Sequence, residues 1–212
     1  MIGRPRVGVL AVQGAFVEHE EALRDVGADT VQVRTSAELA GVGGLVIPGG
    51  ESSTLGLVAG ESGLLDAIRT AVADGLPVFG TCAGLIMLAR TTTAGAQTLI
   101  GAMDTVVRRN AFGRQVASFE APVDMDEVGD EPVPGVFIRA PWIEQAGPDV
   151  TVLATYDGHI VAARQGAMLV TAFHPELTDD RRVHALFVDM VRAHGAEADK
   201  ANIAGGSARV RA

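Results

Sequence analysis

The first half of the chain alternates between short apolar runs and segments with helical character. Four apolar runs are typical of strands buried on both faces: Arg6–Val12, Thr30–Val33, Gly44–Ile47 and Pro77–Phe79. Helices are predicted over Val17–Val26, Leu64–Asp74 and Leu85–Arg90. Because strands and helices take turns along the chain, this half predicts a parallel sheet with helices on both faces.

The second half is dominated by strand patterns. Strands are predicted over Gln115–Val123, Gly135–Arg139, Val152–Tyr156, His159–Arg164 and Met168–Phe173. Asp157-Gly158 and Gln165-Gly166 separate neighbouring strands as tight hairpin turns do. A final amphipathic helix is predicted over Asp179–His194. The whole pattern predicts an α/β three-layer fold with a mixed, mainly parallel central sheet and an added antiparallel portion.

The pattern also bears on domain organisation. No linker or internal repeat interrupts residues 1–194, so we expect a single domain there. Residues 195–212 are rich in Ala and Gly and show no periodicity, which predicts a frayed, disordered C-terminal tail.

Composition and charge narrow the function classes. Apolar residues make up 48% of the 212 positions and charged residues 20%, so the chain can bury a core. The net charge of −9 argues against binding to nucleic acid or to an anionic membrane, since both need a basic surface. The longest apolar stretch, Val78–Ala89, is shorter than the ~20 residues of a membrane-spanning helix. We therefore expect a soluble, cytoplasmic protein.

The only cysteine, Cys82, lies in Gly80-Thr81-Cys82-Ala83-Gly84, between a predicted strand and a predicted helix. A lone cysteine is most often a small buried apolar residue. This spacing of glycines is instead typical of a nucleophile elbow, a cramped turn where larger side chains would clash. The helix N-terminus favours the thiolate, and the Ala83 N–H would point at a developing oxyanion.

His174 and Glu176 follow the predicted strand Met168–Phe173. Pro175 favours an extended backbone at His174, and residues two apart in extended chain project to one side. Glu176 could then orient one imidazole nitrogen while the other faces Cys82. The pattern predicts a nucleophile–base–orienter triad.

Other kinds of site are disfavoured. His174 and His184 are ten residues apart with no second ligand nearby, so no metal site is expected, and no cofactor motif is evident. The loop 49–53 lacks the Lys of a phosphate-binding P-loop, and Glu51 would repel phosphate. A carboxylate or carbonyl ligand suits this loop better.

With the triad in place, the sequence resembles the class I (triad-type) glutamine amidotransferases, and within them the glutaminase subunits of pyridoxal 5′-phosphate synthases. The resemblance covers about residues 7–192. Its motifs are Val12-Gln13-Gly14-Ala15 with Glu18-His19, Pro48-Gly49-Gly50-Glu51-Ser52-Ser53-Thr54, Arg109–Gln115 (RNAFGRQ), Ser118-Phe119-Glu120, Phe137–Pro141 (FIRAP) and Phe173–Thr178 (FHPELT). The 109–115 and 137–141 motifs are the more specific ones.

The resemblance implies a reaction and its catalytic residues. L-Glutamine is hydrolysed to L-glutamate and ammonia, and the ammonia passes to a synthase (lyase) subunit that builds pyridoxal 5′-phosphate from a pentose phosphate and a triose phosphate. Cys82 would form a glutamyl thioester, His174 would transfer protons, and Glu176 would orient His174. The resemblance further implies a large hetero-oligomer with that synthase subunit.

The resemblance also assigns binding positions. Residues that match glutamine-binding positions of the family are Gly50, Glu51, Ser52, Arg109, Ile138 and Arg139. Gly50 and Ala83 would supply the oxyanion donors. The positions that match the partner-facing part of the family are Gln13, Gly14, Glu18 and His19.

Two departures and two alternatives stay open at the level of sequence. Trp142 stands where a smaller polar residue or His is expected, and Arg108 beside Arg109 allows a one-residue misregister. The chain could serve another amidotransferase, such as imidazole glycerol phosphate synthase. It could also be a cysteine peptidase or chaperone-like protein on a similar elbow.

Overall fold

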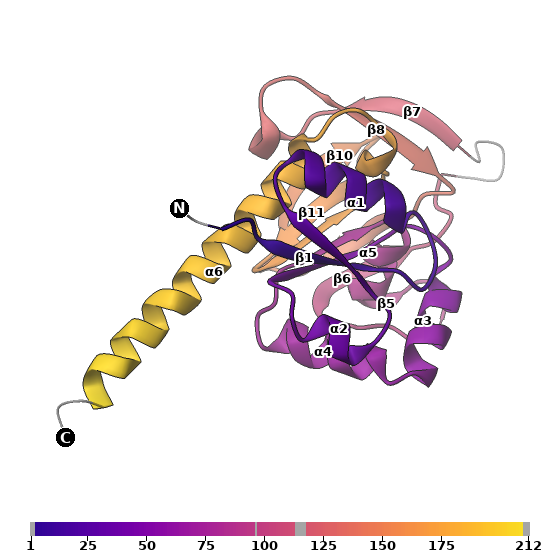
Figure 1. Cartoon of the computed structure of the whole chain (residues 1–212). Coiled ribbons are helices and arrows are strands. Elements are labelled where there is room, and N and C mark those ends of the chain that lie inside the picture. The colour runs from indigo at the N-terminus through magenta and orange to yellow at the C-terminus, as the bar shows by residue number, and fades with distance from the viewer. Residues whose placement is uncertain (1–2, 96, 113–117, 210–212) are drawn as a thin grey trace.

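The computed structural model of the chain describes residues 3–95, 97–112 and 118–209 (Figure 1). Its strands are β1 (Arg6–Leu10), β2 (Asp29–Val33), β3 (Gly44–Ile47), β4 (Val78–Thr81), β5 (Ala89–Thr92), β6 (Met103–Arg108), β7 (Ser118–Val123), β8 (Val133–Ile138), β9 (Trp142–Ala146), β10 (Thr151–Tyr156), β11 (His159–Gln165) and β12 (Met168–Thr171). Its helices are α1 (Phe16–Asp25), α2 (Ser36–Leu39), α3 (Ser52–Glu61), α4 (Leu64–Ala73), α5 (Ala83–Leu88) and α6 (Arg182–Arg209), with 3-10 turns η1 (Asp126–Val128) and η2 (Pro175–Leu177).

The central sheet has the strand order β2-β1-β3-β4-β12-β11-β9-β6-β5, and β10 pairs with β11. From β2 to β12 every neighbouring pair is parallel. The pairs β12–β11, β11–β9 and β9–β6 are antiparallel. The predicted mixed, mainly parallel sheet with an antiparallel portion is therefore confirmed.

Helices cover both faces of the parallel part. Phe79 on β4 packs against Phe187 and His184 of α6. A Cβ at the next position, Gly80, would instead meet Leu88 of α5. Since successive strand residues point to opposite faces, α6 and α5 lie on opposite sides of the sheet. Helix α1 contacts α6 on one side. Helix α4 contacts both α2 and α3, and α3 also contacts α5, which completes the three layers (Figure 1).

Tight turns join the antiparallel strands as expected. Asp157 and Gly158 both have positive φ, 49° and 75°, between β10 and β11. Gly166, with φ of 56°, lies in the turn between β11 and β12. Strands β7 and β8 form a separate antiparallel pair rather than joining the central sheet. The first residues of the predicted strand Gln115–Val123 lie outside the described part of the chain.

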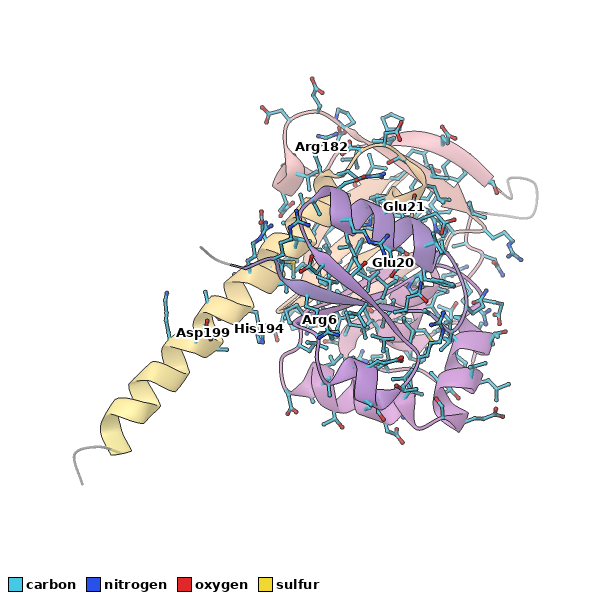
Figure 2. The ribbon with its side chains drawn as sticks, viewed as in Figure 1. Arg6, Glu20, Glu21, Arg182, His194 and Asp199 are labelled. Carbon is cyan, nitrogen blue, oxygen red and sulfur yellow. The ribbon has the colours of Figure 1, made fainter. Side chains whose placement is uncertain are left out.

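Helix α6 differs from its prediction at both ends. It begins at Arg182, whose guanidinium binds the Glu131 and Pro132 carbonyl oxygens and so ties the helix start to the segment before β8. It continues to Arg209, where a frayed tail was expected from Gly195 onward. Ala, Glu and Lys between Gly195 and Gly205 have high helix propensity, and an isolated glycine such as Gly195 weakens a helix without ending it. In Figure 2, Asp199 lies on the part of α6 that projects away from the body.

Candidate active site

Cys82 occupies a strained turn between β4 and α5. Its φ of 47° and ψ of −95° are unusual for a residue with a side chain. A Cβ at Gly84 would lie 2.1 Å from the Ile47 carbonyl oxygen, and one at Gly80 would lie 2.6 Å from the Gly84 carbonyl carbon. Both glycines are thus required for the turn to form, and the predicted elbow geometry is present.

His174 reaches the elbow because β12 runs parallel to β4, with Thr171 paired to Thr81. The carboxyl ends of these neighbouring strands meet at one edge of the sheet. The His174 amide donates to the Val136 carbonyl oxygen at 2.9 Å, which fixes the backbone beyond the strand end. The Cys82 N–H donates to the Thr171 carbonyl oxygen at 2.8 Å, so the two segments are joined directly.

Glu176 lies 2.7 Å from His174 Nδ1 through its Oε1 atom. The contact was predicted, but the backbone that delivers it was not. Residues Pro175–Leu177 form the 3-10 turn η2 and not extended chain. Proline is well suited to the first position of a helical turn because its missing N–H has no partner there in any case.

The three side chains of the predicted triad are almost fully buried. Cys82 is 7% exposed, His174 6% and Glu176 5%. Burial lowers the pKa of His174, but hydrogen bonds to and charges on the neighbouring Cys82 and Glu176 outweigh burial and raise this pKa to about 10. Burial raises the pKa of Glu176, and the adjoining histidines more than offset it, so this pKa is lowered. The neighbours of His174 therefore favour its protonated form, the imidazolium.

The loop before α3 packs tightly on His174. A Cβ at Gly49 would lie 2.2 Å from His174 Cε1, and one at Gly50 would lie 2.4 Å from Gln13 Oε1. The Glu51 N–H donates to Gln13 Oε1 at 2.9 Å. Within the described residues, neither the Gly50 nor the Ala83 N–H has a protein acceptor, so both can donate to a ligand.

A pocket of about 110 Å³ opens over Cys82. All six predicted glutamine-binding residues line it, together with Cys82 and two residues that the sequence did not indicate. The lining residues are Gly50, Glu51, Ser52, Cys82, Ile86, Arg109, Asn110, Ile138 and Arg139.

Charged groups of opposite sign face each other in this pocket. Arg109 donates to Glu51 Oε1 at 2.9 Å and to Gln97 Oε1 at 2.9 Å. Slight burial raises the pKa of Glu51, but hydrogen bonds from Thr54 and Ser53 outweigh it and lower this pKa to about 2. Glu51 is therefore an anion at neutral pH, and Arg109 is its counterion.

The end of β8 forms the opposite wall. Arg139 has a φ of 44°, which turns the chain directly after the strand. The Ile138 carbonyl oxygen lies 4.0 Å from Cys82 Sγ. The backbone of Ile138 therefore faces the thiol.

Arg108 points away from the pocket and binds Glu144 at 2.9 and 3.2 Å. The choice of Arg109 over Arg108 at the pocket agrees with this geometry. Trp142 stacks on His159, with ring centroids 3.5 Å apart, and donates to Glu144. It packs at the start of β9, an interior strand of the sheet, and does not line the pocket.

The residues predicted to face a partner divide into two groups. Glu18 and Gly14 are exposed, and Gln13 is half-buried beneath the Gly50 loop. His19, in contrast, is fully buried, so its predicted place on a partner-binding surface is wrong. The helical period explains the error. Glu18 and His19 are adjacent in α1, so their side chains point in different directions, and of this pair Glu18 faces outward.

Gln97, Asn110 and Ile86 were missed by the sequence analysis. Gln97 reaches Arg109 from a loop without regular structure, so no spacing could indicate it. Asn110 adjoins Arg109 and has a φ of 47°, a conformation that Asn tolerates. Ile86 follows Cys82 by one helical turn, which is the one signal that could have found it.

Among residues 3–95, 97–112 and 118–209, no group of three or more His, Cys, Asp or Glu side chains is placed to hold a metal ion. In that same part of the chain, no helix is long and apolar enough to cross a membrane.

Comparison with known proteins places this geometry in a family. Residues 9–193 match the SNO glutamine amidotransferase family. The chain belongs to this family. The resemblance to glutamine amidotransferases that the sequence motifs indicated is thereby confirmed.

Individual members of the SNO family are similar over nearly their whole length. A protein named pyridoxal 5′-phosphate synthase subunit PdxT from Frankia alni is 58% identical, covering 90% of this chain and 97% of its own. The protein of that name from Streptomyces coelicolor is 56% identical, covering 92% and 98%. A crystal structure described as a glutamine amidotransferase has 45% identity and a TM-score of 0.83, covering 87% of this chain and 98% of its own.

Proposed function

We propose that the chain is the glutaminase subunit of a pyridoxal 5′-phosphate synthase. It hydrolyses L-glutamine to L-glutamate and ammonia and supplies the ammonia to a synthase subunit within a large hetero-oligomer. One observation carries the proposal. Cys82 sits on a strained elbow beside the His174–Glu176 pair, in a chain that is 58% identical to a subunit bearing that name.

The chemistry follows from the positions of the triad. His174 takes the Cys82 thiol proton, Sγ attacks the side-chain carbonyl carbon of glutamine, and the carbonyl oxygen becomes an oxyanion that the Gly50 and Ala83 N–H groups stabilise. His174 gives its proton to the departing nitrogen as the C–N bond breaks, which releases ammonia and leaves a glutamyl thioester. His174 then takes a proton from water, which attacks the thioester and releases glutamate and the thiol.

The charges of the pocket suit a zwitterionic amino acid. The Glu51 carboxylate can pair with the α-ammonium group of glutamine, and Arg109 and Arg139 can pair with its α-carboxylate. Ile86 and the backbone of Ile138 leave room for the aliphatic part of the side chain. An uncharged peptide segment would offer no charged group to Glu51, Arg109 or Arg139, which disfavours a peptidase.

The choice of pathway is supported by the names of the relatives. Proteins named as pyridoxal 5′-phosphate synthase subunits match almost end to end, which favours that complex over imidazole glycerol phosphate synthase. The substrates of the synthase partner would be a pentose phosphate and a triose phosphate.

The test measures ammonia released from glutamine and the pyridoxal 5′-phosphate formed. We expect weak ammonia release by the chain alone, stronger release with the synthase subunit, and glutamine-dependent pyridoxal 5′-phosphate formation only in the mixture. Cys82→Ala should abolish glutamine-dependent synthesis, while added ammonium salt restores it because the synthase subunit is intact. Unchanged glutaminase activity in Cys82→Ala would contradict the proposal.

A further inference from the structure

Glu176 has two carboxylate oxygens, and His174 engages only one of them. Oε1 lies 2.7 Å from His174 Nδ1. Oε2 is buried and has no hydrogen-bond partner within the 3.5 Å range among the described residues. His19 Nε2 lies at the edge of that range, 3.5 Å from Oε2. A buried anionic oxygen is costly without a donor, so the group that faces it matters.

His19 belongs to α1 and is completely buried. Its Nε2 atom also lies 3.1 Å from Thr81 Oγ1, next to the nucleophile in sequence. Its Nδ1 atom lies 3.0 Å from Nε2 of His184, which is equally buried in α6. Both ring nitrogens of His19 therefore have polar neighbours, and the ring connects Glu176 to a second histidine.

Both of these histidines are neutral. Burial lowers the pKa of His19 despite the opposing charge of Glu176. Burial likewise lowers the pKa of His184 to about 3. Each ring then carries one N–H, and the short contact between the rings requires one histidine to donate and the other to accept.

The carboxylate decides which histidine donates. If His19 donated from Nδ1, the lone pair on its Nε2 would face the anionic Oε2 atom, which is repulsive. If His184 donates from Nε2, His19 accepts at Nδ1 and carries its hydrogen on Nε2. That hydrogen is then shared between Thr81 Oγ1 and Glu176 Oε2, as in a three-centre hydrogen bond. The second arrangement gives the anion a donor.

We propose that His19 is a positioning residue of the triad, with its Nε2–H as the second donor to Glu176 and His184 fixing its tautomer. The inference rests on the glutaminase function proposed above. Donors on both oxygens fix the plane of the carboxylate. Glu176 then holds His174 with its other nitrogen toward Cys82. Neither His19 nor His184 lines the glutamine pocket.

Because His19 lies behind the triad and outside the pocket, its replacement should change kcat and leave the KM for glutamine nearly unchanged. Loss of the Nε2–H lets Glu176 and His174 leave the productive orientation, so kcat falls. The KM for glutamine stays close to its wild-type value because the pocket is untouched. If His19 only filled space, a replacement that keeps an N–H donor and one that lacks it would lower kcat to the same extent.

The test compares His19→Leu, which removes the donor, with His19→Gln, whose amide nitrogen can take the place of Nε2. Glutamine hydrolysis is measured with the synthase subunit present, and thermal unfolding reports on folding. We expect kcat to fall about 10-fold to 100-fold in His19→Leu. This is the range found when a residue that orients a metal-binding side chain is replaced, a comparable positioning role. His19→Gln should recover most of that loss. Leu23→Val, an equally buried position of α1 away from the triad, should keep the wild-type kcat.

Three results would overturn the inference: a kcat within twofold of wild type in His19→Leu, equal losses in the Leu and Gln variants, or a change confined to KM. If His19→Leu does not fold, His184→Leu and His184→Gln provide the same comparison one step further from Glu176. Failure of the proposed function is distinguishable, because the wild-type chain would then release no ammonia from glutamine with the synthase subunit.

Discussion

Arg109 illustrates at the scale of one residue how the pocket is organised. Its guanidinium contacts Glu51, Gln97 and Ser53, at 2.9, 2.9 and 3.4 Å. Its neighbour Arg108 has the same chemistry and contacts Glu144 on the outside. The strand alternation at the end of β6 sends the two side chains in different directions, so only Arg109 of this pair lines the pocket.

Replacement of Arg109 should therefore weaken glutamine binding selectively. Arg109→Gln removes charge-assisted hydrogen bonds worth about 1.5–3 kcal/mol, so the KM for glutamine should rise at least about tenfold. The measurement is steady-state glutaminase kinetics with the synthase subunit. Arg108→Gln is the matched control and should keep the wild-type KM. Equal KM values for the two variants would contradict the assignment of Arg109 to the pocket.

Sequence and structure agree best where chemistry depends on adjacent residues. The elbow around Cys82 and the His174–Glu176 pair are local, so spacing alone predicts them. Gln97 and His184 reach the site from distant segments, and no local pattern marks either of them. His19 was misplaced on the surface because its burial depends on which side of α1 the sheet covers.

At the scale of elements, the site depends on close approach between backbones. Helix α5 can start directly after β4 only because its second residue is Gly84, beside the end of β3. The sequence predicted this strand–turn–helix unit within a few residues. It missed α2, α3, β5, β6 and β9. Helix α2 is only four residues long, α3 has a weak apolar stripe, and the three strands gain their regularity from pairing with neighbours.

Two glycine substitutions should therefore have opposite effects on stability. Gly84→Ala would bring a Cβ to 2.1 Å from the Ile47 carbonyl oxygen, and backbone atoms there must move. We expect it to lower the free energy of unfolding by about 1–3 kcal/mol, as overpacking does. Gly60 is an exposed position of α3, and a Cβ there would meet no atom within 4 Å, so Gly60→Ala should raise the free energy of unfolding by about 0.5–1 kcal/mol. Denaturant unfolding of the two variants measures both changes, and a Gly84→Ala protein as stable as wild type would contradict the packing described for the elbow.

At the scale of the whole molecule, the fold brings four distant segments together behind the triad. His19, Thr81, Glu176 and His184 come from α1, β4, η2 and α6, and the two histidines are 165 residues apart. The alternation of strands and helices predicts which layers exist, but the pairing of α1 with α6 on one face is a property of the assembled sheet. Because this polar cluster contacts both Thr81 and Glu176, the packing of α1 against α6 affects the positions of the triad residues.

The buried histidines should make the whole molecule sensitive to mild acid. Burial lowers the pKa of His184 to about 3 against an ordinary value of 6.5, and it also lowers the pKa of His19. Unfolded chains then bind more protons than folded ones as pH falls below 6.5, so stability is lost in that direction. At pH 5 His184 alone should cost about 2 kcal/mol of unfolding free energy. The raised pKa of His174 contributes equally at all pH values below 6.5, and the lowered pKa of Glu176 matters only below its ordinary value of 4.5.

Urea unfolding at pH 6.5 and pH 5.0 measures this loss, because the stabilisation that comes from the raised pKa of His174 is nearly constant in this window. His184→Gln cannot be protonated, so its unfolding free energy should change less between the two pH values than that of the wild type. The groups that face His184 are His19 and Glu176, with Arg181 nearby, and all three are retained in the variant. A wild-type protein as stable at pH 5.0 as at pH 6.5 would mean that the two histidines are not held neutral in the fold. The proposed hydrogen bonds from His184 to His19 and from His19 to Glu176 would then be contradicted as well, because they require one hydrogen on each ring.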